Sequence, residues 1–261
     1  MILGTWNVNG VRARAQRLIE WLAERKPDVV CLQELKVKTD ELDRDALKAA
    51  GYHVAAIGQA SWNGVAVLSR EPLETVSTEL PGAAADAGAR FIVTRRDDGL
   101  EVASVYVPNG KTTSNPEFRS KLAWLERLAL HIESRPDKEA PFVLAGDFNV
   151  CTTDLDSYLG ARAHGTIFHT DEERALIGRL TAAGLCDLYR SKYTAEPGYS
   201  WWDYRAGAFH RKLGMRLDLI LATDVVARRV KDVFIDREFR KKSKLSGALP
   251  SDHAPVVAVL D

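Results

Sequence analysis

Residues that bind metal ions or transfer protons stand at the ends of several apolar segments of this sequence. They are Asn7, Glu34, Asp147, Asn149, Asp252 and His253. The neighbouring apolar segments have the length and composition of buried strands, and strand ends at one edge of a sheet lie close together. A single carboxylate at a strand end is more often a turn former or a solvated group. The recurrence at several strands nevertheless favours a common site.

Asp218 differs from these residues because it lies within the apolar segment MRLDLILAT, which predicts a strand. A carboxylate in such a strand is costly to bury unless it is paired. His253 is the favoured partner, since an Asp–His pair fixes the imidazole tautomer and raises its pKa. Arg216, two residues away on the same face, is the alternative. By the same spacing rule, Asp147 and Asn149 should share one face of their strand, which favours a joint role.

The chemistry of this set is that of oxygen ligands, without a sulfur or imidazole cluster. Such donors favour Mg²⁺ or Mn²⁺ over zinc. The motifs GxxxxGK[ST], GxGxxG and GxSxG are absent from the sequence, which argues against P-loop nucleotide hydrolysis, hydride transfer and serine hydrolase chemistry. Metal-assisted hydrolysis remains, in which a base activates water and donors stabilise the charge that develops on a phosphate.

The elements that would position these groups follow from the periodicity of apolar residues. Strands are expected at 2–8, 28–34, 65–69, 91–95, 101–107, 142–150, 216–222 and 254–260, and helices at 14–25, 40–50, 117–134 and 172–183. Asp97-Asp98-Gly99 is a hairpin signal between two of the strands. Many strands with several intervening helices predict a mixed α/β fold, and we expect one domain over residues 1–261.

Composition excludes several classes of protein. The hydrophobic content of 46% excludes intrinsic disorder. Lys and Arg number 36 and Asp and Glu number 36, so bulk basicity of the histone type is excluded. The cysteines, Cys31, Cys151 and Cys186, form no CxxC pair, which is typical of a reducing compartment. The sequence contains no signal peptide and no membrane-length apolar run, so we expect a cytoplasmic protein.

Seven short motifs occur in the order found in the exonuclease III family. They are WNVNG at 6–10, LQELK at 32–36, YVPNG at 106–110, GDFNV at 146–150, SWWDYR at 200–205, RLDLIL at 216–221 and SDHAP at 251–255. The chain therefore resembles the AP endonucleases of the DNase I-like endonuclease/exonuclease/phosphatase superfamily over essentially its whole length. The resemblance implies a four-layer α/β sandwich, in which two mixed β-sheets pack face to face and are flanked by helices.

The resemblance also implies an activity. Members act on double-stranded DNA with Mg²⁺, or Mn²⁺ as a substitute. They hydrolyse the phosphodiester 5′ to abasic sites, and many remove nucleotides or blocking groups from damaged or recessed 3′ ends. We expect a monomeric enzyme of the bacterial type that does not bind a membrane. Hydrolysis of a non-DNA phosphoester is the alternative within the superfamily, and SWWDYR argues against it. A DNA-binding protein without activity is a further alternative, against which the complete polar set argues.

Individual roles carry over by matching residues. The metal ligands would be Asn7, Glu34, Asp147, Asn149 and Asp252. Asp147 matches the base for the attacking water, although a leaving-group acid role is also argued in the family. Asn149 resembles the residue that orients this water and the phosphate, and Tyr106 matches a phosphate contact. His253 resembles the phosphate-binding histidine, with Asp218 as its orienting carboxylate.

Substrate contacts are implied around SWWDYR. Trp201, Met215 and Leu217 match the wall of a pocket that accepts the sugar without its base. Such an apolar pocket selects a flipped-out sugar. Of Trp201 and its neighbour Trp202, at least one should be a core residue. Asn109 and Arg211 are expected to contact the DNA backbone. Arg90 and Lys111 are candidates for the same role, with a solvated surface position as an equal alternative.

Two departures from the family pattern affect this region. Met215 stands where some relatives carry Trp, so we expect a softer pocket wall. Cys151-Thr152 follows GDFNV where relatives commonly have a small residue and Pro, which is expected to loosen that loop. Neither departure touches a catalytic group.

The zero net charge conceals an uneven distribution. Residues 205–244 contain 12 Lys or Arg against 5 Asp or Glu, a surplus of seven basic residues. The basic residues include Arg211, Lys212, Arg228, Arg229, Arg240, Lys241, Lys242 and Lys244. We expect about half of them to be solvated and some of the others to line DNA phosphates.

Overall fold

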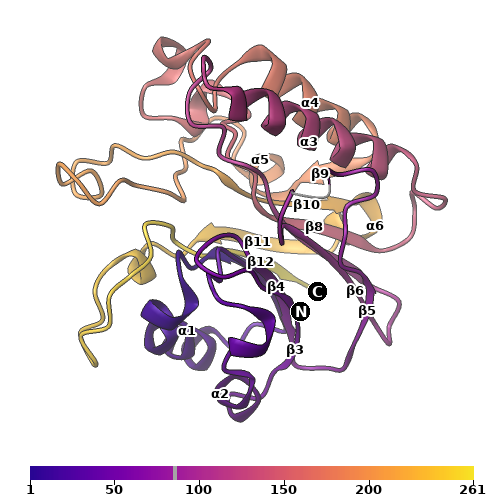
Figure 1. Cartoon of the computed structure of the whole chain (residues 1–261), viewed down its shortest axis with the longest axis vertical. Coiled ribbons are helices and arrows are strands. Elements are labelled where there is room, and N and C mark those ends of the chain that lie inside the picture. Colours follow the sequence, from indigo (N-terminus) through magenta and orange to yellow (C-terminus); the bar gives the residue numbers. More distant parts are fainter. Residues whose placement is uncertain (85–86) are drawn as a thin grey trace.

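Two mixed β-sheets form the centre of the computed structural model, which describes residues 1–84 and 87–261 (Figure 1). The first sheet contains β1 (Ile2–Asn7), β2 (Val29–Gln33), β3 (His53–Ile57), β4 (Val65–Ser69), β11 (Val230–Ile235) and β12 (Val256–Leu260), in the order β11-β12-β1-β2-β4-β3. The second contains β5 (Leu73–Ser77), β6 (Phe91–Arg96), β7 (Glu101–Tyr106), β8 (Phe142–Asp147), β9 (Leu185–Asp187) and β10 (Asp218–Thr223), in the order β5-β6-β7-β8-β10-β9.

Helices cover the outer face of each sheet, as Figure 1 shows. Helices α1 (Val11–Arg25) and α2 (Arg44–Ala49) pack on the first sheet, and α3 (Pro116–Glu133) and α4 (Asp171–Ala182) pack on the second. The short helices α5 (Leu188–Lys192) and α6 (Asp224–Ala227) and the 3-10 turns Thr39–Glu41, Asp154–Asp156, Gly160–Ala163 and Arg237–Arg240 complete the helical structure of the described residues. In this part of the chain no helix is both long and apolar enough to cross a lipid bilayer.

The central core lies between the two sheets. Val29 and Val67 of the first sheet pack in one cluster with Ile92, Val102 and Ile220 of the second. Two outer clusters lie between each sheet and its helices. These layers confirm the expected four-layer α/β sandwich of two mixed sheets flanked by helices.

The strands missed by the sequence analysis are those at the sheet edges: β3, β5, β9 and β11. An edge strand is paired and covered on fewer sides than a central strand, so its sequence carries a weaker apolar pattern. In β5, for example, the middle three residues are exposed. The helix expected at 40–50 is also divided, into the 3-10 turn Thr39–Glu41 and α2.

The strand directions bring the polar strand ends together. β1 and β2 are parallel, and so are β7 and β8, in which Tyr106 pairs with Asp147. β10 runs antiparallel to β8 and starts at Asp218, opposite Asp147. Because β12 is antiparallel to β1, His253, which precedes β12, lies at the end of β1 that carries Asn7. These side chains therefore share one end of the sandwich.

Candidate active site

Asp147 lies at the centre of the polar cluster and is buried. The amide nitrogen of Asn7 donates to Asp147 Oδ2 and to Glu34 Oε1, each at 2.9 Å, so it joins the two sheets. Gly146 is needed at its position because a Cβ atom there would lie 1.9 Å from the carbonyl oxygen of Val105. Close approach of β7 to β8 therefore fixes the glycine before the carboxylate.

Asn149 contacts Asp147 through a turn of the backbone, and not through the two-residue spacing of an extended strand. The strand ends at Asp147, and Asn149 has a φ of 51°, so the prediction that both share one face of an extended strand is wrong. The turn instead lets the backbone N–H of Asn149 donate to Asp147 Oδ1 at 2.9 Å. The side-chain nitrogen of Asn149 donates to the carbonyl of Val107 at 3.0 Å. Short polar side chains tolerate this left-handed backbone and hydrogen-bond locally.

His253 pairs with Asp218, as the sequence analysis favoured. His253 Nδ1 lies 2.8 Å from Asp218 Oδ2, and its Nε2 lies 3.8 Å from Asp147 Oδ2. The alternative partner, Arg216, pairs with Asp156 and Asp187 instead. Asp218 is the first residue of β10 and does not lie within the strand as expected. Both residues are buried, so the pairing compensates for the loss of solvent.

The charges of this pair are coupled to Asp147. Burial alone would lower the pKa of His253, but the carboxylates of Asp218, Asp147 and Asp252 together outweigh burial and raise that pKa well above the ordinary value. Burial raises the pKa of the Asp147 carboxyl, and the charge of His253 opposes this rise. The arrangement therefore favours a cationic imidazole beside a carboxylate that is more basic than usual, a suitable pairing for phosphate binding and proton abstraction.

Tyr106 and Asn109 border the same cluster. Burial and the neighbouring carboxylates of Glu34 and Asp147 raise the pKa of the Tyr106 hydroxyl well above its ordinary value, so it stays a neutral donor. Asn109 donates from its side-chain nitrogen to Asn149 Oδ1 at 3.3 Å. The Arg90 guanidinium lies 4.7 Å from the centroid of the Tyr106 ring and so helps to hold this tyrosine in place.

A second acidic position lies beside the first. Glu34 Oε2 is 2.7 Å from the Lys36 ammonium, which also donates to Asn9 Oδ1 at 2.5 Å. Asn9 in turn donates to Asp252 Oδ1 at 2.8 Å, and the indole of Trp201 donates to Asp252 Oδ2 at 3.1 Å. Glu34, Lys36 and Asn9 all have positive φ values, between 47° and 55°. Such backbone strain in residues other than glycine concentrates at functional sites.

Acidic groups that could hold a metal ion are thus present. Among the described residues, Asp147, Asp218 and His253 place one ligand atom each within 4.8 Å of one another. Asp218 Oδ2 is already engaged by His253 and by the Ser200 hydroxyl at 2.6 Å, whereas its Oδ1 is buried without a partner in the described part of the chain. Oxygen donors dominate both this group and the Glu34 position, so the donor set fits a hard cation.

An apolar cluster lies next to His253. Trp201 forms backbone bridges with both Met215 and His253, which places the tryptophan between them. Met215 and Leu217 pack with Cys151, Phe168 and Trp201 in one small cluster. Trp202, by contrast, is buried in a separate core cluster, which confirms that one of the two tryptophans is a core residue.

Cys151-Thr152 does not loosen the loop, contrary to our expectation. Cys151 is buried, and its thiol donates to the backbone carbonyl of Asp156 at 3.4 Å. The Thr152 hydroxyl donates to the Asp156 carboxylate at 2.6 Å. The loop is therefore anchored by side-chain hydrogen bonds where a proline would have restricted its backbone.

We expect Met215→Trp to change the ratio of abasic-site incision to 3′-nucleotide removal by about tenfold. A rigid indole at this position would narrow the sugar pocket that we expect there. The ratio is measured on two labelled duplexes with one enzyme preparation. Met215→Leu is the matched control, since it conserves volume and should leave the ratio unchanged. An unchanged ratio in Met215→Trp would contradict the role of this wall.

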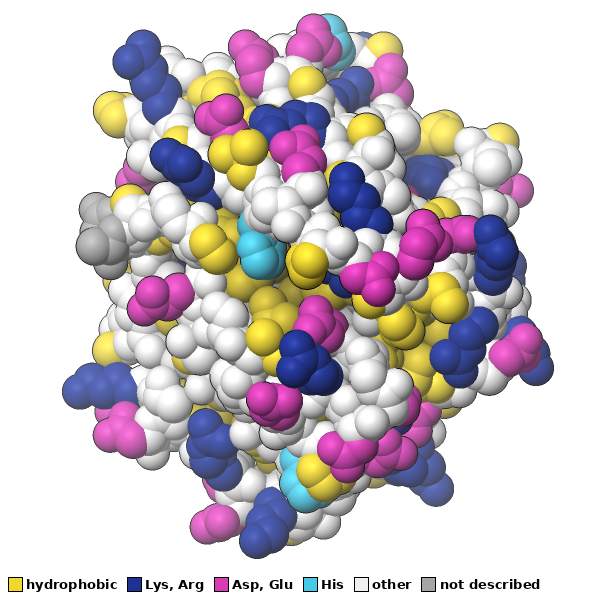
Figure 2. All heavy atoms as spheres, turned by 90° about the vertical axis from the view of Figure 1, so that its right-hand side faces the viewer, with side chains coloured by type: hydrophobic (Ala, Val, Ile, Leu, Met, Phe, Trp, Pro, Cys, Tyr) yellow, Lys and Arg dark blue, Asp and Glu magenta, His cyan; other side chains and the backbone are white. Residues whose placement is uncertain are grey.

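The basic stretch 205–244 does not form one surface. Arg211 is exposed in the segment before Met215 and donates to the backbone carbonyl of Ala206 at 3.4 Å. Arg229 bonds to the carbonyl of Asp261 and so lies at the far end of β12 from His253, and Arg228 is paired with Asp224. Figure 2 shows the right-hand side of Figure 1, where Lys and Arg are interspersed with Asp and Glu.

Arg240 is also structural, because it is buried and donates to the backbone carbonyls of Asp252 and Trp202. Fewer basic residues of the stretch 205–244 are therefore candidates for phosphate contacts than their number suggested. Arg228, Arg229 and Arg240 are excluded by their positions.

Ser200, Asn9, Lys36 and Lys121 belong to the site or its support and were not identified from the sequence. Ser200 accepts hydrogen bonds from the backbone N–H groups of Leu217 and Asp218, each at 3.1 Å, while its hydroxyl donates to Asp218. Lys121 carried a visible signal, because it stands three residues after Phe118 and four before Leu125, on the apolar face of its helix.

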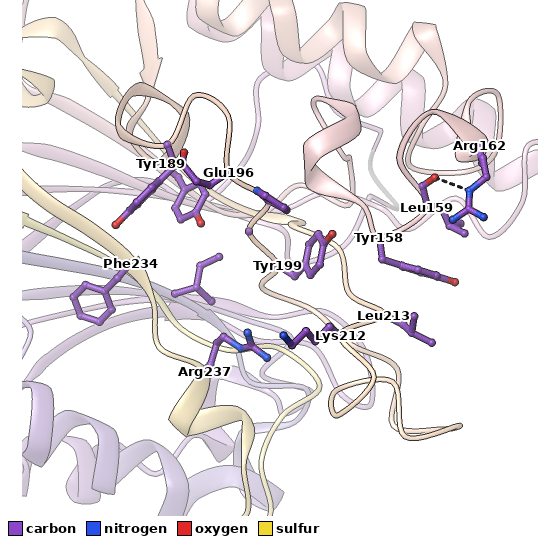
Figure 3. A pocket seen from close by; sticks show the side chains of 14 residues that line it. Tyr158, Leu159, Arg162, Tyr189, Glu196, Tyr199, Lys212, Leu213, Phe234 and Arg237 are labelled. Carbon is purple, nitrogen blue, oxygen red and sulfur yellow. Dashed lines mark hydrogen bonds between the residues drawn. The ribbon is translucent and has the colours of Figure 1, made fainter.

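A separate cavity of about 870 Å³ lies on another part of the surface (Figure 3). Tyr158, Tyr199, Lys212 and Arg237 are among its lining residues. Glu196 is the only acidic side chain among the described residues that line it. None of the proposed catalytic residues lines this cavity.

Comparison with known proteins agrees with this geometry. A model of the Endonuclease/Exonuclease/phosphatase family matches residues 4–253. The chain is 33% identical to exodeoxyribonuclease III of Haemophilus influenzae over 97% of both proteins. Among solved structures, a 3′ phosphatase from Neisseria bound to a product DNA hairpin has a TM-score of 0.94 and 36% identity, covering 100% of this chain and 99% of the other. An AP endonuclease from Archaeoglobus fulgidus has a TM-score of 0.94 and 35% identity, with the same coverage.

Proposed function

The chain belongs to the endonuclease/exonuclease/phosphatase family, and from this premise we propose that it is a DNA repair nuclease. It would hydrolyse the phosphodiester 5′ to abasic sites, remove nucleotides or blocking groups from 3′ ends, or do both. The observation that carries the proposal is the position of the apolar residues Trp201, Met215 and Leu217 directly beside the Asp147–His253–Asp218 cluster. A sugar without its base could pack against these apolar side chains, which would form the sugar pocket, while its phosphate meets the catalytic cluster.

The residues divide the reaction between them. Asp147, with its raised pKa, would accept a proton from the attacking water, which Asn149 orients. His253, held by Asp218, would donate a hydrogen bond to the phosphate, and Tyr106 would add a second donor. Donors that are fixed before the reaction stabilise the charge that develops on phosphate oxygens.

The Glu34 position fits Mg²⁺, for which Mn²⁺ could substitute. A cation, the Lys36 ammonium, already lies 2.7 Å from Glu34. We assign the principal donor roles to Glu34 and Asp252, with Asp147 and Asn149 close by. Asn7 directs its amide nitrogen to the carboxylates and its oxygen to the Asn9 N–H, so it orients Glu34 in this arrangement. When bound, the ion would neutralise the phosphate charge.

A panel of end-labelled duplexes tests the proposed function. One duplex carries an abasic site, one a recessed 3′ end and one a 3′ phosphate, and each is incubated with Mg²⁺. We expect turnover of at least one, with a product whose end identifies the bond that is cleaved. Failure on all three, together with release of phosphate from an inositol phosphate or a sphingolipid, would favour the non-DNA alternative. Binding without turnover of any substrate would favour a DNA-binding protein.

We expect chelation by EDTA to stop the reaction, and added Mg²⁺ or Mn²⁺ to restore it, because the phosphate charge would otherwise be left unneutralised. The measurement is the incision rate before chelation, after chelation and after metal is returned. Isothermal titration of Mg²⁺ into Glu34→Gln, compared with the wild-type protein, locates the ion independently of activity. Full activity in the chelator would contradict the metal assignment.

A further inference from the structure

A buried ion pair lies behind the active site, between Lys121 of α3 and Glu173 of α4. Both side chains are 0% exposed. Burying two charges is costly, and such a pair survives only where good geometry and additional hydrogen bonds compensate for the lost solvent. The partners of these two side chains therefore indicate what the pair holds in place.

Lys121 connects two turns of the active site, those that carry Asn109 and Asn149. Its ammonium donates to the backbone carbonyl of Asn149 at 2.6 Å and to that of Asn109 at 3.3 Å, and its remaining contact is Glu173. A lysine ammonium has three donors, so all three are used within the protein. The side chains of the two asparagines are also bonded to each other, at 3.3 Å.

Glu173 connects the ion pair to Phe168, which packs beside the apolar residues that would form the sugar pocket. Its Oε1 accepts from the Phe168 N–H at 3.2 Å, and its Oε2 accepts from the N–H and the hydroxyl of Thr170 at 3.1 and 2.9 Å. Phe168 packs against the Met215 cluster, and its ring centroid lies 4.7 Å from the Lys121 ammonium. A cation over an aromatic face adds further attraction.

The ion pair forms hydrogen bonds with two residues whose backbone is strained. Asn149 has a φ of 51° and Phe168 a φ of 71°, both in the left-handed region. For a bulky side chain such as Phe this conformation is a clear outlier, and it persists only where the surroundings determine it. Lys121 binds the carbonyl of the first strained residue, and Glu173 binds the N–H of the second.

We propose that Lys121 and Glu173 are a positioning pair that fixes Asn149 relative to Phe168, so that a sugar seated in the pocket presents its phosphate to Asn149 and Asp147 in the reactive geometry. This inference rests on the proposed function. Neither side chain can touch the substrate, because both are completely buried, so they act through the two turns. Small errors in such placement reduce turnover more than binding.

The test is the double variant Lys121→Met/Glu173→Gln, which removes both charges and leaves no unpaired buried charge. We expect kcat for the abasic duplex, per folded molecule, to fall by about 30-fold or more, while KM changes by less than about threefold. The matched control is Glu133→Gln/Arg179→Met, which removes a half-buried ion pair that joins the same two helices. The control should retain the wild-type kcat, since this pair has no bond to either turn.

A second variant decides the question if the double variant does not fold. Lys121→Arg keeps the charge beside Glu173, but a planar guanidinium cannot direct donors to the carboxylate and both carbonyls as an ammonium does. We expect its kcat to fall by about tenfold with KM unchanged. Wild-type kcat in either folded variant, or an equal loss in the control, would overturn the inference. Absence of turnover by the wild-type protein on every duplex would instead refute the proposed function.

Discussion

Asp147→Ala is expected to lower the rate of abasic-site incision by at least about a thousandfold while leaving duplex binding largely intact. Asp147 is the carboxylate on which the Asn7 amide, the Asn149 turn and His253 converge. Its loss removes the proposed base, but Asn7 keeps its bond to Glu34, so the framework of the site stays in place. Single-turnover rates and equilibrium binding in EDTA separate the two effects.

Asp97→Ala is the control for this substitution, because Asp97 is an exposed carboxylate on the hairpin between β6 and β7. It should incise at the wild-type rate. Undiminished incision by Asp147→Ala would refute the assigned role. A parallel loss of binding and rate would show that Asp147 acts in substrate affinity, and the base would then have to be sought elsewhere in the cluster.

Arg216→Met is expected to lower the free energy of unfolding by about 3–5 kcal/mol. Arg216 is completely buried and bonds to Asp156 at 2.6 Å and to Asp187 at 2.9 Å. Burial alone would raise the pKa of Asp156, but Arg216 holds it below its usual range. Among the described residues, the substitution would leave the buried Asp156 carboxylate with only Arg190 as a charged partner. Unfolding in urea measures the loss of stability.

The control for Arg216→Met is Arg205→Met, whose ion pair with Asp203 is exposed, with an arginine side chain 88% accessible. An exposed pair contributes little, so its loss should change the free energy of unfolding by less than about 1 kcal/mol. Equal effects of the two substitutions would contradict a stabilising role for the buried network. The comparison is valid only if the slope of each unfolding curve is unchanged.

The central strands and their helices could be predicted from the sequence because burial on both faces leaves a continuous apolar signature. β4 was expected at 65–69 and is found there, and α3 was expected within one residue of its limits. The four edge strands could not be predicted in this way, because each depends on a neighbour that the local sequence does not contain. Their pairing is decided when the sheets form.

Part of the candidate site was also accessible from the sequence. A carboxylate within an apolar segment must find a partner, and this requirement pointed from Asp218 to His253, 35 residues away. The supporting residues were not accessible in this way. Lys36 and Asn9 look like ordinary surface residues in the sequence, and they acquire a role only because β1 and β2 end side by side.

The sequence by itself determined which chemistry this protein can perform, because residue types limit the available ligands, bases and donors. Seven ordered motifs also determined the family, since their order is hard to produce by chance. Only the tertiary structure decided which groups meet. The parallel pairing of β1 with β2 and of β7 with β8 places Glu34 and Asp147 on the two sides of Asn7. Only the packing of α3 against α4 could show that the buried Lys121–Glu173 pair joins the turn of Asn149 to Phe168, which packs against the Met215 cluster, because that contact spans 52 residues of sequence.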